Sequence, residues 1–201
     1  MSVAGASARL RLFVALRVGP AAAEVLAGEA RRLAEQDPAL RLVRPADMHV
    51  TLQFLGDCPE GDVAALAGAL DGVAAGTPPF TVGYAGLGVF EDRHPARHLW
   101  AGARSEPAGS LARLAGDVER ALVLLGYPRR QRPYVPHATI AKLQRGQVLA
   151  DATRRALEAT PAGQGAEYGR EGVSVLNLMV SLADPVGYAY KNLTSHRLGG
   201  A

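Results

Sequence analysis

The chain contains 201 residues, with 22 Lys plus Arg against 19 Asp plus Glu, five His and the single cysteine Cys58. Its 48% apolar and 20% charged residues are typical of a folded globular protein and exclude a disordered chain, and a single cysteine excludes an intramolecular disulfide. The net charge of +3 permits an anionic partner without requiring one, because all basic residues except Lys142 and Lys191 are arginine in a chain rich in Ala and Gly. The apolar stretch 10–18 is too short and too charged for a membrane span or a signal peptide, so we expect a soluble cytoplasmic protein without a membrane partner.

The predicted elements alternate between strands and helices, as judged from apolar periodicity and from Pro and Gly at element ends. In chain order we expect a strand at 10–16, a helix at 20–36, a short strand at 41–43, a strand at 49–55, a helix that opens at Pro59 and ends by Gly76, strands at 80–89 and 98–103 around a polar loop at 91–97, a helix at 105–125, a strand at 137–143, a helix at 148–159, and strands at 173–182 and 188–193. No linker is long enough to separate independent domains. We therefore predict a single α+β domain over residues 1–201.

A short pattern of His, any residue, Thr and an aliphatic residue occurs twice, at His49–Leu52 and again 88 residues later at His137–Ile140. Five His and seven Thr in 201 residues lead one to expect only about 0.2 His-x-Thr pairs by chance. Each copy follows a proline-containing segment and precedes a predicted helix. This weak duplication predicts two similar lobes around a central cleft.

The paired motifs carry the residue types needed for chemistry at phosphorus. In a strand, His and Thr two positions apart share one face, and the residues between them face a core. An imidazole titrates near neutral pH, so one ring can act as a base on a nucleophile while the other protonates a leaving oxygen. Threonine hydroxyls can donate hydrogen bonds to phosphate oxygens. The pattern predicts metal-independent acid–base displacement, and the residues alone leave open which His is the acid.

These motifs resemble the 2H phosphoesterase superfamily, and more closely its bacterial RNA 2′,3′-cyclic phosphodiesterase branch, also called 2′-5′ RNA ligase-like. Four segments distributed over most of the chain are similar to that branch, at 11–15, 48–56, 99–102 and 132–137. The resemblance implies two similar lobes of antiparallel sheet with outer helices around a central cleft. It also implies an enzyme that hydrolyses a terminal 2′,3′-cyclic phosphate, on RNA or on a small cyclic nucleotide, to a 2′-phosphomonoester. We expect a monomer that needs no metal and no cofactor.

The resemblance also implies individual roles. His49 would donate a proton to the leaving 3′ oxygen, His137 would accept a proton from water, and Thr51 and Thr139 would hold the phosphate. Lys142 stands where this branch often carries an arginine that contacts phosphate; lysine keeps the charge but loses the bidentate geometry. Strict alternation places Lys142 on the face opposite His137, so a phosphate contact requires a bulge or the end of the strand.

Several other residues have two readings. The segment 129–132 is either a solvated turn or a contact to the RNA backbone, and Phe13, Trp100 and Tyr134 are either core residues or platforms for a base. We expect the remaining histidines on the surface, at His94, His98 and His196. A histidine metal site is the weaker alternative because no cluster has ligand spacing.

Two further functions stay open from the sequence. The first is a binding module for RNA ends or nucleotides that keeps the fold without catalysis. The second is the reverse reaction, which forms a 2′-5′ RNA bond on the same site.

Overall fold

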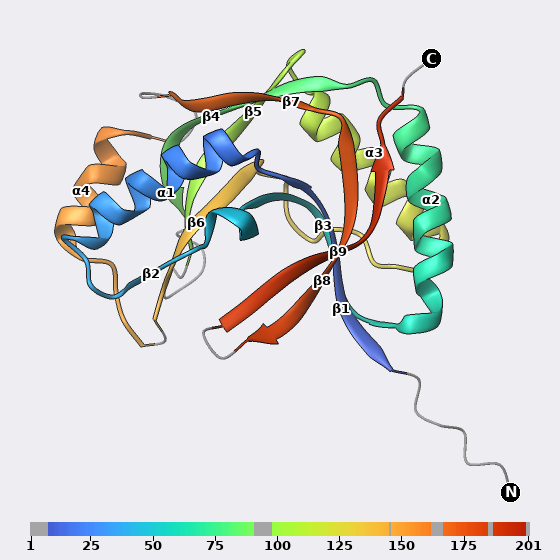
Figure 1. The fold of residues 1–201 in the computed structure, drawn as a ribbon, viewed down its shortest axis with the longest axis horizontal. Helices are drawn as coiled ribbons and strands as arrows, with labels where there is room; N and C mark the ends of the chain where they lie inside the picture. Colours follow the sequence, from blue (N-terminus) through green and yellow to red (C-terminus); the bar gives the residue numbers. More distant parts are fainter. Residues whose placement is uncertain (1–7, 91–97, 145, 162–166, 185–186, 200–201) are drawn as a thin grey trace, which may run out of the picture.

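The computed structural model describes residues 8–90, 98–144, 146–161, 167–184 and 187–199 (Figure 1). In chain order its elements are β1 (Arg9–Arg17), α1 (Pro20–Ala34), β2 (Leu40–Leu42), η1 (Pro45–Asp47), β3 (His49–Pro59), η2 (Glu60–Asp62), α2 (Val63–Ala75), β4 (Phe80–Val89), β5 (His98–Glu106), α3 (Ser110–Leu124), β6 (His137–Leu143), α4 (Asp151–Ala159), β7 (Glu167–Val173), β8 (Val175–Asp184) and β9 (Gly187–Arg197). The predicted loop at 91–97, which includes His94, lies outside the described residues.

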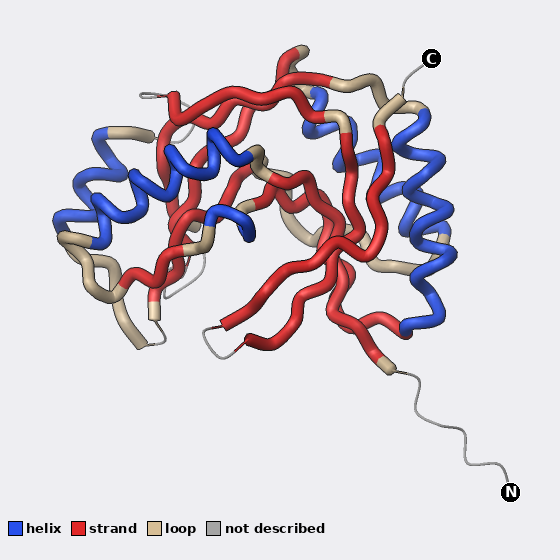
Figure 2. The backbone as a smooth tube through the Cα atoms, viewed as in Figure 1, coloured by secondary structure: helices blue, strands red, loops and turns tan. Residues whose placement is uncertain are grey.

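The nine strands of the described residues form one antiparallel sheet in the order β7-β4-β5-β6-β3-β1-β8-β9, with β2 paired to β6. Figure 2 shows the strands in red and the helices in blue. Two halves meet in the middle of this order, where β3 and β6 share the single registered pair Val50–Ala138. In Figure 1, α2 and α3 lie on one side of the molecule and α1 and α4 on the other. The predicted α+β class with antiparallel sheet and outer helices is confirmed.

One continuous apolar core joins the helices to the sheet. Helix α1 begins at Pro20, whose missing N–H costs nothing at this position, and buries Leu26 and Leu33. Helix α2 buries Leu66 and Leu70 in the same core. In the described part of the chain, no helix is both long enough and apolar enough to cross a membrane.

Two predicted helix starts are wrong because a strand continues through them. Cys58, just before the predicted start at Pro59, pairs with Leu10 in β3 and is fully buried, and Gly56 takes a positive φ of 77° inside that strand. Helix α2 therefore begins at Val63 and not at Pro59. Similarly, β5 runs on to Glu106, and the hydroxyl of Ser105 accepts a hydrogen bond from the N–H of Leu111 at the start of α3.

The C-terminal strands also differ from the prediction. The predicted strand at 173–182 is in fact the end of β7 and nearly all of β8, which are separated at Ser174 and lie in different halves of the sheet. The prediction for 188–193 is correct but short, since β9 extends over Gly187–Arg197. The helix predicted at 148–159 begins at Asp151.

Candidate active site

The two His-x-Thr motifs lie side by side at the junction of the two halves. Val50 and Ala138 pair there and are fully buried, so the flanking His and Thr residues of both strands share the opposite face. Extending this antiparallel register by one residue places His49 opposite Thr139 and Thr51 opposite His137. In this extended register the two histidines are diagonal neighbours across the two strands. We call the face that carries these four half-buried residues the site face.

A bulge follows each motif at the same position. The β1–β3 register skips Leu52, directly after Thr51, and the β5–β6 register skips Ile140, directly after Thr139. An extra residue reverses the alternation that follows it. The bulge at Ile140 therefore returns Lys142 to the site face, as its predicted phosphate contact requires.

Both imidazoles are held in the same way by the backbone. Nδ1 of His49 lies 2.6 Å from the carbonyl oxygen of Asp47, and Nδ1 of His137 lies 2.7 Å from that of Val135. A carbonyl oxygen only accepts, so Nδ1 carries the hydrogen in each ring. In the neutral rings Nε2 is then the basic nitrogen, the one that can accept a proton.

Aromatic rings fix the plane of each imidazole. The His49 ring packs against Phe13 at 5.0 Å and edge-on against Tyr190 at 4.9 Å between centroids. His137 packs edge-on against Phe90 at 4.9 Å and against Trp100 at 5.7 Å. The exposed fractions of Phe13 and Trp100 are only 3% and 7%, so these rings support the histidines and are not open platforms for a base.

Two cations, Arg17 and Lys142, and the carboxylate of Asp47 act on His49. Burial lowers the pKa of His49 from 6.5 to about 4, and the cations of Arg17 and Lys142 act in the same direction, against the hydrogen bond to Asp47. Lys142 Nζ donates to the hydroxyl of Tyr190 at 3.1 Å, beside the ring that contacts His49. The site thus holds a neutral His49 among cations, an arrangement that suits an anion.

Phe54 is a candidate that the sequence reasoning missed. It follows the first bulge, at the same offset from His49 as Lys142 from His137, and so it also returns to the site face. Its side chain is 69% exposed, and its ring lies 6.1 Å from that of Phe13. In the sequence, Phe54 follows His49 by five residues as Lys142 follows His137, and this shared spacing is the signal that could have identified Phe54.

Other predicted residues have structural partners. Arg130 donates to the carbonyl oxygens of Leu52 and Ala115 at 2.9 and 3.0 Å, and its backbone N–H donates to Glu119. The reading of segment 129–132 as an RNA-backbone contact therefore does not apply to Arg130, whereas Arg129 is exposed.

The expectation for His196 is wrong. It is 4% exposed, because Nδ1 contacts Asp71 of α2 at 2.6 Å and Nε2 contacts the Thr194 hydroxyl at 2.8 Å. Its two ring nitrogens are thus both engaged inside the fold. His98 is half-buried at the start of β5, where it pairs with Lys142.

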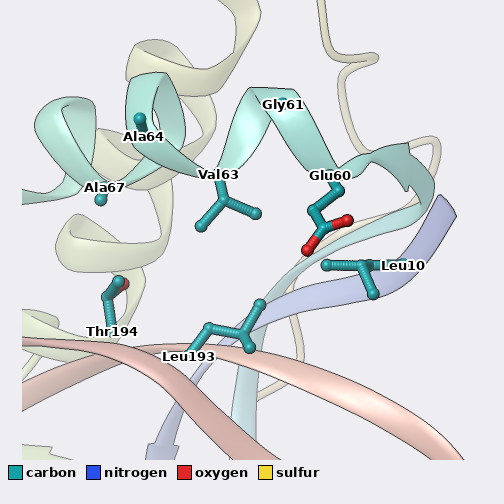
Figure 3. A pocket seen from close by; sticks show the side chains of 8 residues that line it. All are labelled: Leu10, Glu60, Gly61, Val63, Ala64, Ala67, Leu193 and Thr194. Atoms are coloured by element: carbon teal, nitrogen blue, oxygen red, sulfur yellow. The ribbon is translucent and has the colours of Figure 1, made fainter. Parts of the chain in front are cut away.

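One pocket of the described residues lies away from the two motifs. Within the described residues, no group of three or more His, Cys, Asp or Glu side chains is placed to hold a metal. A pocket of about 410 Å³ lies between the start of α2 and strands β1 and β9, on the helix side of the sheet (Figure 3). It is lined by Leu10, Glu60, Gly61, Val63, Ala64, Ala67, Leu193 and Thr194, mostly apolar residues and none from either motif.

Comparison with known proteins identifies the family to which this chain belongs, a family of phosphoesterases. A family model described as LigT like Phosphoesterase matches residues 18–100. A protein of Aquifex aeolicus named RNA 2′,3′-cyclic phosphodiesterase is 34% identical over 160 residues, which are 79% of this chain and 81% of the relative. The chain belongs to the LigT-like phosphoesterase family. The predicted family and the predicted enzyme class, a phosphoric diester hydrolase, are confirmed.

Further matches support the assignment. A protein of the same name from Geobacillus stearothermophilus is 43% identical over 105 residues, so the match spans 52% of this chain but only 33% of that relative. Among solved structures, TT0787 of Thermus thermophilus matches with a TM-score of 0.75 and 24% identity, and Escherichia coli LigT complexed with 3′-AMP with 0.71 and 22%. Each match covers 95% of this chain and 99% of the other, which establishes the same fold.

Proposed function

We propose that this protein is an RNA 2′,3′-cyclic phosphodiesterase that hydrolyses a terminal 2′,3′-cyclic phosphate to a 2′-phosphomonoester without a metal. The name of the Aquifex aeolicus relative and the nucleotide bound to the Escherichia coli structure support an RNA end or a small cyclic nucleotide as substrate. The observation that carries the proposal is the matched pair of imidazoles. Each donates from Nδ1 to a carbonyl two residues earlier, and both lie on the site face beside a threonine.

In the proposed reaction, His137 Nε2 accepts a proton from water as the water oxygen bonds to phosphorus. The bond from phosphorus to the 3′ oxygen breaks, and His49 Nε2 donates its proton to that oxygen. The 2′ oxygen keeps the phosphate. A general acid or base of this kind contributes about 10²–10⁴-fold to the rate.

The remaining site residues bind the anion. Thr51 and Thr139 donate hydrogen bonds to the non-bridging oxygens, and Lys142 neutralises charge on them. Because the cations of Lys142 and Arg17 lower the pKa of free His49, a bound phosphate that neutralises them raises it. Substrate binding thereby supplies the protonated His49 that the reaction needs.

The exposed ring of Phe54 favours a nucleotide over a simple phosphodiester. Aromatic side chains stack on unpaired bases regardless of base identity. Phe54 lies one register step from Thr51 along β3, so it can contact the base of a nucleotide whose cyclic phosphate is held by the motifs.

The test is hydrolysis of an oligonucleotide with a 2′,3′-cyclic phosphate end by the wild type, His49→Ala and His137→Ala, in EDTA. We expect a 2′-phosphomonoester from the wild type and losses of at least about 100-fold in kcat from both variants. Circular dichroism establishes that each variant is folded. Saturable binding without product identifies a binding module, and a 2′-5′ linked product identifies a ligase; each of these outcomes overturns the proposal.

Acid and base are separated with bis(p-nitrophenyl) phosphate, whose leaving group departs without protonation. With this substrate His49→Ala should lose much less activity than His137→Ala. The opposite ranking would reverse the two roles.

A further inference from the structure

Strand β1 carries arginines on the site face at both of its ends. Leu12, Val14 and Leu16 belong to the helix-side core. The alternate residues of β1 therefore share the site face. They are Arg9, Arg11, Phe13, Ala15 and Arg17.

The registers of β3 and β8 arrange these residues in rows across the sheet. The Ala15 row contains Thr51 and Asn177, the Phe13 row contains Phe54 and Met179, and the Arg11 row contains Asp57 and Ser181. Moving along β1 from the motifs, one therefore meets first the proposed phosphate site, then the exposed Phe54 ring, then Arg11.

The arginines of β1 differ in their contacts. Arg9 donates to the carbonyl oxygen of Asp57. Arg17 donates to Asn192 at 3.0 Å, to the carbonyl oxygen of Tyr190 at 3.1 Å and to that of Ala46, so it is held inside the fold. Arg11 is exposed, and the described part of the chain offers it neither a hydrogen bond nor an ion pair. Its guanidinium is thus available to an external anion.

We propose that Arg11 binds the phosphodiester on the 5′ side of the terminal nucleotide, so that the RNA strand leaves the site along β1 past Phe54. The proposal rests on the proposed function. Arg11 lies four positions along β1 from Ala15, about 13 Å, a distance that a nucleotide seated on Phe54 and an extended arginine side chain cover together. Ser181, beside Arg11, can donate a hydrogen bond to the same phosphate.

Asp57 gives the row a second, opposing charge. Its exposed carboxylate is the β3 neighbour of Arg11 and repels a phosphate that passes there. If the RNA strand follows this path, Arg11 strengthens its binding and Asp57 weakens it. If the RNA strand leaves the site in another direction, neither side chain affects binding.

The experiment compares adenosine 2′,3′-cyclic phosphate with the dinucleotide ApA ending in the same cyclic phosphate, which adds one phosphodiester on the 5′ side. Arg11→Ala should lower kcat/KM for the dinucleotide about tenfold, the effect of one charge-assisted hydrogen bond, and leave the mononucleotide within about twofold. Arg113→Ala, at an exposed arginine on α3, should change neither value. Asp57→Asn should raise kcat/KM for the dinucleotide alone.

Equal effects of Arg11→Ala on both substrates, or none on the dinucleotide, overturn the assignment of Arg11. If the wild type hydrolyses neither substrate, the proposed function itself is wrong. The mononucleotide therefore separates the two failures.

Discussion

The central residue of the site is His49, which combines a backbone hydrogen bond with a desolvated ring among cations. In the free protein its pKa of about 4 keeps it neutral at physiological pH, because burial, Arg17 and Lys142 all disfavour the imidazolium. A proton donor has to be protonated when the leaving oxygen departs. The proposed mechanism therefore requires that binding of the substrate anion raises the pKa of His49.

We predict that a bound cyclic phosphate raises the pKa of His49. The measurement uses His137→Ala, which should bind adenosine 2′,3′-cyclic phosphate without hydrolysing it, and NMR titration of the His49 ring. We expect a value near 4 in the free protein and a clearly higher one in the complex, with affinity that increases as the pH falls. A pKa that stays the same in the complex would place the phosphate away from His49.

Lys142→Ala and Lys142→Arg supply matched controls for that titration. Removing the cation should raise the pKa of His49 in the free protein, whereas arginine should leave it low, since Lys142 is one of the groups that lower this pKa.

The low pKa of His49 also affects folding. The unfolded state takes up the proton first, so the contribution of His49 to stability falls as the pH drops from about 6.5 to 4.

At the level of elements, the segment between α3 and β6 connects the two motifs. Arg130 of this segment holds the carbonyl oxygen of Leu52, the bulge residue that follows Thr51, and lies 5.2 Å above the Tyr134 ring. The same segment provides Val135, whose carbonyl oxygen orients His137. One stretch of chain therefore positions residues of both strands.

We predict that Arg130→Ala destabilises the protein by about 2–4 kcal/mol, because it leaves two carbonyl oxygens and the half-buried Glu119 without their guanidinium partner. Arg129→Ala is the matched control, since the neighbouring side chain is exposed, and it should change stability by less than about 0.5 kcal/mol. Urea unfolding measures both. Equal stabilities would contradict the assignment of Arg130 to the fold.

Elements that depend on residues close together in the sequence could be predicted, whereas elements that depend on contacts between distant residues could not. The motif strands β3 and β6 were predictable because His-x-Thr and its buried neighbours repeat with a period of two. The start of α2 was not predictable from local sequence. Gly56 is typical of the end of a strand, but here it takes a positive φ inside β3. The strand continues because Cys58 pairs with Leu10, which lies 48 positions earlier in the chain. The contacts of His196 with Asp71 also depend on long-range packing.

At the scale of the whole molecule, helices cross between the two halves of the sheet. Helix α1 follows β1 but packs on β7, β2 and β6 of the other half. Helix α3 follows β5 and packs against β3 and α2 of the other half as well as against β5. The chain therefore passes repeatedly between halves. Because each half is covered by a helix that follows a strand of the other, we expect neither to be stable alone.

This arrangement predicts a single cooperative unfolding transition for residues 1–201. Leu66→Ala removes a fully buried side chain from α2, in the half formed by β3, β1, β8 and β9. Trp100, the only tryptophan, reports on the other half from β5. A buried leucine truncated to alanine costs about 2–5 kcal/mol, which corresponds to a fall in Tm of at least about 4 °C in a protein of this size.

We expect tryptophan fluorescence and far-ultraviolet circular dichroism to show the same lowered Tm in Leu66→Ala. Leu124→Ala, at a side chain that is 87% exposed at the end of α3, should leave both signals unchanged. A Trp100 transition that stays at the wild-type temperature while the dichroism falls earlier would show two separately folding units. In that case the crossing helices would not couple the halves, and the prediction of one domain would be wrong.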